Sequence, residues 1–410
     1  MEMDFQRWLM WLRWLDDFGM WGKLRGSKQE STRAPSTDLN FCLVMGIWTA
    51  QCTVCYRRLV MRGFVRQVRQ VRQVRQVRRR ACGLLCDWGM MAGTMSGFQI
   101  SVAGAKLWVD WVARESSEHS PNPPVLILHG GPGADSDYLR PHMDSLALVG
   151  KGQSLCYYDQ RGSERSPQDA GAAAPTAWQH VDDVEAMRCY MQTDRLRIVG
   201  YSWGGLLAAL YAARHPSRVE KLILISPAPA TSYMRDRTRE RMEAAMERPE
   251  LASFRKQLGS LPTMDERRRR FALAVSPYFF VPNRALLLRP FWIKARVEKA
   301  AWESLGVGFD VRPLLQAAWR VPTLIVLGAQ DVIPVENAHE IAQVMRAQVV
   351  ELPECGHVPF IEQSELLWAW LGRFLDPGTS KTEKALDGMN TGQGVSFDYG
   401  KLPRWRNGIA

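Results

Sequence analysis

Short runs of apolar residues recur through the chain and alternate with stretches that have helical spacing. The runs lie at 125–128, 155–158, 196–199, 222–225, 324–327 and 348–352. Strands that are apolar on both faces are typical of a parallel sheet covered by helices. The pattern therefore predicts an α/β fold, with a mainly parallel sheet and helices on both of its faces.

Other segments complete this expected core. Alternating apolar positions in 98–102 and 107–111 predict a leading hairpin, and a helix is expected after Thr176. Residues 365–375 form an amphipathic pattern that predicts a closing helix. The expected core thus spans residues 95–227 and 320–376.

Residues 228–319 interrupt the alternation of strands and helices, because they are helical in pattern, charged and aromatic. An insertion between two strands, over their carboxyl ends, acts as a cap on the site beneath it. We therefore expect residues 228–319 to form a helical cap. Residues 377–410 are polar and rich in glycine, which predicts a disordered tail.

Residues 1–94 differ in character from the rest. Val-Arg-Gln repeats with period three over 65–80, so on a helix the valines spiral around the axis instead of forming one face. The apolar stretch 39–56 is interrupted by polar residues and short for a membrane span, so no membrane partner is expected. We interpret this segment as a disordered basic extension, or as absent from a native product that starts near Met91 or Met95.

Charge and cysteine content limit the remaining interpretations. Of the net charge of +11, +9 lies in residues 1–94 and +2 in residues 377–410, so the expected globular part is neutral and no specific nucleic-acid partner is expected. A rival hypothesis is a non-catalytic, nucleic-acid-associated protein that uses the basic tract. The pairs Cys52/Cys55 and Cys82/Cys86 lack a zinc-knuckle pattern, so we expect no metal. The cysteines form no disulfide framework, so we expect reduced thiols in a cytoplasmic protein. No cofactor is expected.

The stretch Gly200-Tyr201-Ser202-Trp203-Gly204-Gly205 joins an apolar strand to a helix with an amphipathic pattern. A G-x-S-x-G at such a turn is typical of a nucleophile elbow. A serine nucleophile needs a base and a third group that orients the base. Asp331 and His357 follow later strands, so Ser202, Asp331 and His357 are the predicted catalytic triad.

The oxyanion of a tetrahedral intermediate requires backbone N–H donors that are already in place. The N–H of Trp203, directly after the serine, is one candidate. Gly131, in the glycine-rich loop after the strand at 125–128, is the other, since glycine allows close approach of backbone to substrate.

Four motifs together resemble the proline iminopeptidase-like branch of the α/β-hydrolase superfamily. They are H-G-G-P-G at 129–133, D-Q-R-G at 159–162, the elbow at 200–205, and Gly356-His357. The resemblance covers about residues 95–376 and implies a metal-independent serine hydrolase that removes N-terminal residues, classically proline, from small peptides.

The resemblance also implies that acidic residues of the cap hold the substrate's free amine. The cap offers Glu243, Glu247, Glu298 and Glu303, and the sequence does not distinguish among them. Relatives with these motifs include carboxylesterases and lactonases, so hydrolysis of small-molecule esters stays an alternative. The oligomeric state is not predicted.

Overall fold

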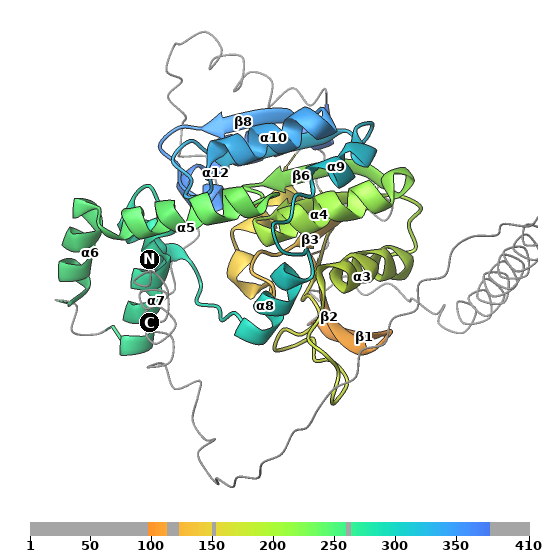
Figure 1. Ribbon diagram of the computed structural model, residues 1–410, viewed down its shortest axis with the longest axis horizontal. Helices are drawn as coiled ribbons and strands as arrows, with labels where there is room; N and C mark the ends of the chain where they lie inside the picture. The colour runs from red at the N-terminus through yellow and green to blue at the C-terminus, as the bar shows by residue number, and fades with distance from the viewer. Residues whose placement is uncertain (1–96, 113–122, 150–152, 260–263, 378–410) are drawn as a thin grey trace, which may run out of the picture. The chain divides into compact units, whose positions relative to one another are not determined.

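The computed structural model describes residues 97–112, 123–149, 153–259 and 264–377 (Figure 1). The predictions made for residues 1–94, including the basic tract and the cysteine pairs, lie outside these residues, as does the tail beyond residue 377. The division of the chain into extension, core, cap and tail therefore stays a prediction.

One sheet organises the described part of the chain. Its strands are β1 (Phe98–Val102), β2 (Ala105–Val112), β3 (Val125–Leu128), β4 (Leu155–Tyr158), β5 (Leu196–Tyr201), β6 (Val219–Ile225), β7 (Thr323–Gly328) and β8 (Gln348–Leu352). They follow the order β1-β2-β4-β3-β5-β6-β7-β8. The hairpin β1–β2 is antiparallel to β4, and the strands from β4 to β8 pair in parallel. The predicted α/β fold is confirmed.

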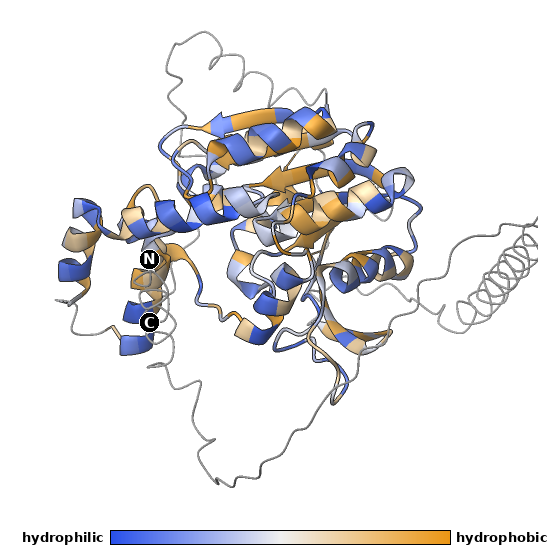
Figure 2. Ribbon diagram, viewed as in Figure 1, coloured by the Kyte–Doolittle hydropathy of each residue, from blue (hydrophilic) through white to orange (hydrophobic). Residues whose placement is uncertain are grey.

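Apolar layers cover both faces of this sheet, because neighbouring residues of a strand point to opposite sides. In β3, Leu126 and Leu128 join one apolar cluster, whereas Val125 and Ile127 join the other. The first cluster includes residues of α3 (Ala177–Tyr190), α4 (Trp203–Arg214) and α10 (Val335–Met345). The second includes η3 (Met143–Leu148) and α12 (Ser364–Leu375). In Figure 2 the strands are accordingly mostly orange, while the outer helices carry both colours.

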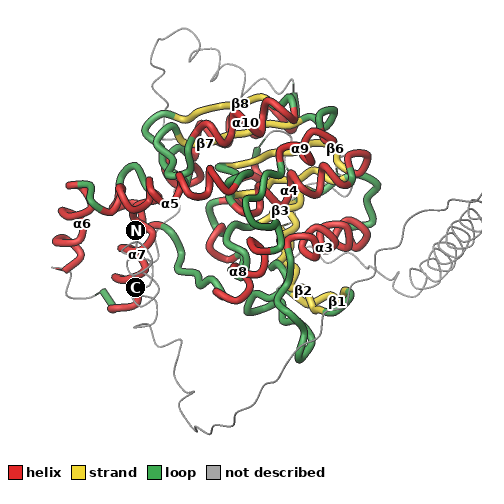
Figure 3. Tube along the Cα trace, in the orientation of Figure 1, coloured by secondary structure: helices red, strands yellow, loops and turns green. Residues whose placement is uncertain are grey.

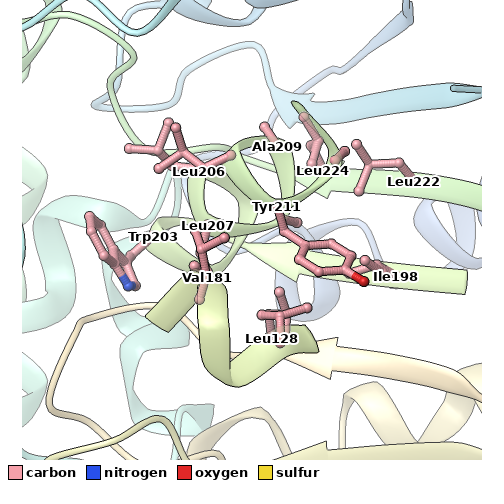
Figure 4. Packing of buried hydrophobic residues seen from close by; sticks show 14 of the residues in the cluster. Leu128, Val181, Ile198, Trp203, Leu206, Leu207, Ala209, Tyr211, Leu222 and Leu224 are labelled. Carbon is pink, nitrogen blue, oxygen red and sulfur yellow. The ribbon is translucent and has the colours of Figure 1, made fainter. Parts of the chain in front are cut away.

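Helix α4 differs from the amphipathic helix expected from its sequence. Every residue from Trp203 to Ala212 is buried, not only those of one face. Figure 4 shows Leu206 and Leu207 of α4 among side chains from several elements, including Val181 of α3 and Leu224 of β6. A helix that is apolar all round belongs in the interior of a domain, and here α3 and α9 cover α4 in addition to the sheet.

The segment between β6 and β7 consists of helices joined by loops where the structure describes it (Figure 3). Its α-helices are α5 (Ser232–Met246), α6 (Pro249–Gly259), α7 (Glu266–Val275), α8 (Ala295–Glu303) and α9 (Arg312–Leu315). Thr231 and Asp310 form an antiparallel bridge near its two ends. On either side of that bridge, Ser232 donates to the carbonyl of Phe309 and Val311 donates to the carbonyl of Ala230.

Asn337 of α10 fixes the point at which the chain leaves β6 for this segment. Its side chain is buried, accepts from the N–H of Ala230 at 2.9 Å, and donates to the carbonyl of Pro227 at 3.0 Å. Buried backbone groups that lose their partners cost more free energy than an ordinary hydrogen bond contributes.

We expect Asn337→Ala to lower the free energy of unfolding by about 2 kcal/mol, because it leaves these buried backbone groups without partners. Urea unfolding followed by circular dichroism measures the change. Asn283→Ala is the matched control, since Asn283 is exposed. Equal stability of the two variants would contradict the assigned role of Asn337.

Candidate active site

Ser202 occupies a sharp turn between β5 and α4. Its backbone has φ 54° and ψ −119°, a conformation that L-residues rarely adopt. Two hydrogen bonds hold the turn: Ser202 N–H donates to the carbonyl of Ile225, and Ala228 N–H donates to the carbonyl of Ser202, both at 2.9 Å. The surrounding structure thus imposes the strained backbone that presents the hydroxyl above the sheet.

Glycines make this turn sterically feasible. A Cβ on Gly200 would lie 2.3 Å from the carbonyl oxygen of Gly204, and one on Gly204 would lie 2.2 Å from that of Leu128. Both contacts are with backbone, which no rotamer change relieves. The elbow therefore requires glycine at both positions for α4 to start directly against β3 and β5.

His357 bridges the serine and a buried aspartate. Its Nε2 lies 3.0 Å from Ser202 Oγ, and its Nδ1 lies 2.9 Å from each carboxylate oxygen of Asp331. Asp331 Oδ1 also accepts the N–H of Ile333 at 2.9 Å, which fixes the carboxylate. Asp331 does not cap α10, whose N-cap residue is Pro334. With Nδ1–H donating to Asp331, Nε2 is free to accept the serine proton.

The two predicted oxyanion donors belong to the loop after β3 and to the start of α4. Gly131 has φ +64° in the loop after β3, and Trp203 is the first residue of α4. Among the described residues, neither backbone N–H has an intramolecular acceptor. Both amides are thus available to a ligand, and Trp203 also has the positive end of the α4 dipole.

Gln160 connects the two loops that carry these donors. Its side-chain oxygen accepts from Trp203 Nε1 at 3.0 Å, and its side-chain nitrogen donates to the carbonyl of His129 at 2.7 Å. Its backbone N–H donates to His129 Nε2 at 2.9 Å, while His129 Nδ1 donates to the carbonyl of Gly130. Both ring nitrogens of His129 are therefore engaged, and burial lowers its pKa. His129 supports the loop and is not a second base.

Comparison with known proteins agrees with this geometry. The model of the α/β-hydrolase fold family matches residues 123–364, more than half of the chain. The chain belongs to the α/β-hydrolase family. It is accordingly a hydrolase, with its site residues gathered where strands of the parallel sheet end, as is usual for open α/β folds.

Individual relatives give a more specific similarity than the family model does. Proline iminopeptidases from Lactobacillus delbrueckii subsp. bulgaricus and Lactobacillus helveticus are each 26% identical to this chain, over 271 and 283 residues. These matches cover 60% and 63% of this chain, and 89% and 92% of the relatives. This α/β hydrolase is therefore similar to proline iminopeptidases along nearly their full length.

Solved structures agree at the level of the fold. The crystal structure of proline iminopeptidase from Mycobacterium smegmatis is 19% identical, covers 71% of this chain and 100% of its own, and gives a TM-score of 0.51. A proline iminopeptidase-related protein from Thermus thermophilus is 23% identical, covers 68% of this chain and 96% of its own, and also gives 0.51.

Segments between β6 and β7 lie directly against the site of this hydrolase. A Cβ on Gly131 would lie 3.0 Å from Cδ1 of Ile293, so Ile293 covers the loop that carries one oxyanion donor. On the other side, the ring of Tyr278 lies 5.2 Å from that of His357, centroid to centroid. These segments therefore approach the serine from two directions.

The four glutamates that the sequence left undistinguished have different surroundings. Glu243, Glu247 and Glu303 are exposed, and Glu303 pairs with Lys299 of its own helix at 3.8 Å. No contact among the described residues connects these three with Ser202. Their exposure is typical of solvated charges on helix faces, so the structure does not bring them into the site.

Glu298 of α8 is the exception. Burial raises the pKa of its carboxyl, and the positive charge of Arg235 opposes that rise. Burial and the negative charge of Glu298 together raise the pKa of the Tyr278 hydroxyl. The ring of Tyr278 contacts that of His357. A sheltered carboxylate near the triad is a candidate for binding a cationic group of a substrate.

Sequence reasoning missed Gln160, Tyr278 and Ile293. Gln160 lies within the D-Q-R-G motif, which could have pointed to it. Its hydrogen bonds to His129 and Trp203, however, become visible only in the fold. Tyr278 and Ile293 belong to the inserted segment and carry no motif.

The described residues contain no cluster of three or more histidine, cysteine or acidic side chains arranged to hold a metal. No helix in the described part combines the length and apolar character that a membrane span requires.

We expect Gly204→Ala to lower the free energy of unfolding by about 3 kcal/mol or more, because its Cβ would force α4 away from the backbone of Leu128. Gly259→Ala is the matched control, since a Cβ there meets nothing within 4 Å. Differential scanning calorimetry measures both variants. A Gly204→Ala protein as stable as the control would show that the close approach is not required.

Proposed function

We propose that this hydrolase acts through Ser202 as nucleophile, His357 as general base and Asp331 as the group that orients the base. The observation that carries the proposal is the continuous hydrogen-bonded series from Ser202 Oγ through both nitrogens of His357 to the carboxylate of Asp331. Chain order adds support, because Ser, Asp and His follow one another as in other α/β hydrolases.

In the proposed reaction, Ser202 Oγ attacks the substrate carbonyl while its proton moves to His357 Nε2. Asp331 stabilises the imidazolium that forms. The tetrahedral intermediate then collapses, and His357 gives the proton to the leaving amine or alcohol, which yields an acyl-enzyme on Ser202. Water, deprotonated by His357, hydrolyses this ester and regenerates the free serine.

The N–H groups of Gly131 and Trp203 stabilise the oxyanion in this scheme. Donors of this kind are each worth about 3 kcal/mol in enzymes where they have been removed. The bridge through Gln160 holds the two loops at a fixed spacing, so the donors need no rearrangement when the charge develops. Preorganised donors of this kind favour acyl transfer.

For the substrate, we infer an aminopeptidase of proline iminopeptidase type that releases N-terminal residues from small peptides. Support comes from the similarity to the Lactobacillus proline iminopeptidases and from Glu298, a sheltered carboxylate suited to a substrate ammonium group. The proposed reaction requires no cofactor, and we propose a cytoplasmic location for the enzyme.

A carboxylesterase or lactonase is the second candidate. The observation that favours it is Arg235, which lies close enough to act on the charge of Glu298. An internal cation reduces the net negative charge available to a substrate amine. Under this alternative, the charge of Arg235 offsets that of Glu298, which does not contact the substrate.

The assigned nucleophile predicts that a fluorophosphonate probe labels the wild type and that Ser202→Ala abolishes the labelling, since the probe reacts with an activated serine whatever the substrate. Labelling is measured by intact mass and fluorescence in gel. Ser163→Ala serves as control, because Ser163 is a buried serine outside the proposed triad. Labelling that survives in Ser202→Ala would refute the assignment.

Glu298→Gln separates the two substrate classes. If Glu298 binds the amine, KM for proline p-nitroanilide rises at least tenfold, while kcat/KM for p-nitrophenyl acetate stays within twofold. Glu303→Gln, on the same helix but exposed, is the control for both assays. Unchanged KM for the anilide, or faster hydrolysis of the ester than of the anilide by the wild type, favours the esterase alternative.

A further inference from the structure

The carboxylate of Glu362 lies between the histidine loop and the segment inserted between β6 and β7. Glu362 ends α11 (Pro359–Glu362) and is 5% exposed. Its Oε2 accepts the N–H of Gly356 at 2.7 Å and that of Phe280 at 3.1 Å, and its Oε1 accepts the N–H of Val281 at 3.0 Å. One side chain thus binds the residue before His357 and two residues of the inserted segment.

Further contacts connect the same two chain segments. The backbone N–H of His357 donates to the carbonyl of Tyr278 at 2.6 Å. A Cβ on Gly356 would lie 2.3 Å from that carbonyl oxygen, so only glycine allows the backbones to approach this closely. Arg284 also donates from Nη1 to the carbonyl oxygen of Glu362 at 2.7 Å.

The core holds the histidine loop from the other end. Gln330, beside Asp331, donates its backbone N–H to the carbonyl of Cys355 and accepts the N–H of Cys355 on its side chain. The loop is therefore bound to the Asp331 loop at residue 355 and to the inserted segment at residues 356 and 357. Each side restrains a different part of the backbone that carries the imidazole.

We propose that Glu362 is a positioning residue, which fixes His357 against Ser202 by joining the histidine loop to residues 278–281 of the inserted segment. The proposal rests on His357 being the general base, as stated above. Its consequence is that residues 278–281 complete the catalytic geometry as well as bordering the substrate site. Catalytic side chains tolerate little displacement, so loosening this junction lowers the rate of the chemical step.

Glu362→Gln tests the proposal with little change in side-chain volume. Glutamine presents one oxygen and one NH₂ group to three backbone N–H donors, so at least one of them faces a donor. We expect kcat to fall at least tenfold, with KM within twofold of wild type, and the rate of fluorophosphonate labelling to fall in parallel. Glu365→Gln is the matched control, three residues further on and on the half-buried surface of α12.

A spectroscopic readout distinguishes positioning from a loss of stability. In proton NMR, the hydrogen-bonded Nδ1–H of His357 gives a downfield resonance, because it donates to the Asp331 carboxylate. We expect this resonance to shift or broaden in folded Glu362→Gln and to stay unchanged in Glu365→Gln. Thermal unfolding of each variant establishes that the protein measured is folded.

Arg284→Met provides a second variant if Glu362→Gln does not fold. It removes the donor to the Glu362 carbonyl on the side of the inserted segment and leaves the carboxylate in place. We expect a smaller fall in kcat, again without a change in KM. Wild-type kcat and an unshifted His357 resonance in whichever variant folds would overturn the proposal.

Failure of the positioning role of Glu362 can be distinguished from failure of the proposed catalytic triad. If Ser202→Ala still reacts with the probe, the triad itself is wrong. If Ser202→Ala is inert but Glu362→Gln is labelled at the wild-type rate, the triad stands and the positioning role of Glu362 is refuted.

Discussion

The close approach of three backbones beneath Ser202 is the constraint on which the rest of the site depends. Gly200 and Gly204 leave no space for a side chain between β5, α4 and the end of β3. That contact fixes where α4 begins, and with it the positions of the half-buried Ser202 and of the N–H of Trp203. Strain at one residue, of order 1–3 kcal/mol, persists because the packing on every side of α4 opposes its relaxation.

The parts of this architecture that the sequence predicted are those with a local signal. Each buried strand appears as an apolar run in the sequence. Ser202 lies within a motif that requires glycines, because a Cβ at Gly200 or Gly204 would collide with backbone. Asp331 and His357 were found from their places after strands, because parallel strands bring their carboxyl ends to one edge of a sheet. In the structure His357 lies beside Ser202, and Asp331 lies on the far side of the imidazole.

What the sequence did not predict depends on contacts between distant segments. The amphipathic pattern of α4 gave no sign that other helices, among them α3 and α9, would bury the rest of its surface. To choose among the four glutamates, one must know which of them the fold removes from solvent. Only Glu298 is partly buried, whereas the other three are exposed. Glu362 resembles any carboxylate on a C-terminal helix until the fold brings the N–H groups of Gly356, Phe280 and Val281 around it.

The bridge between Thr231 and Asp310 has a consequence for how such a protein diversifies. Because the inserted segment leaves and rejoins the sheet at neighbouring points, closed by paired backbone, its length and internal sequence can vary without changing the strand order. The junction at Glu362 limits that freedom at residues 278–281, and the contacts of residues 293–294 with the loop after β3 also limit it. A replacement segment must therefore recreate the backbone donors and the acceptor carbonyl at the histidine loop, together with the contacts at the loop after β3.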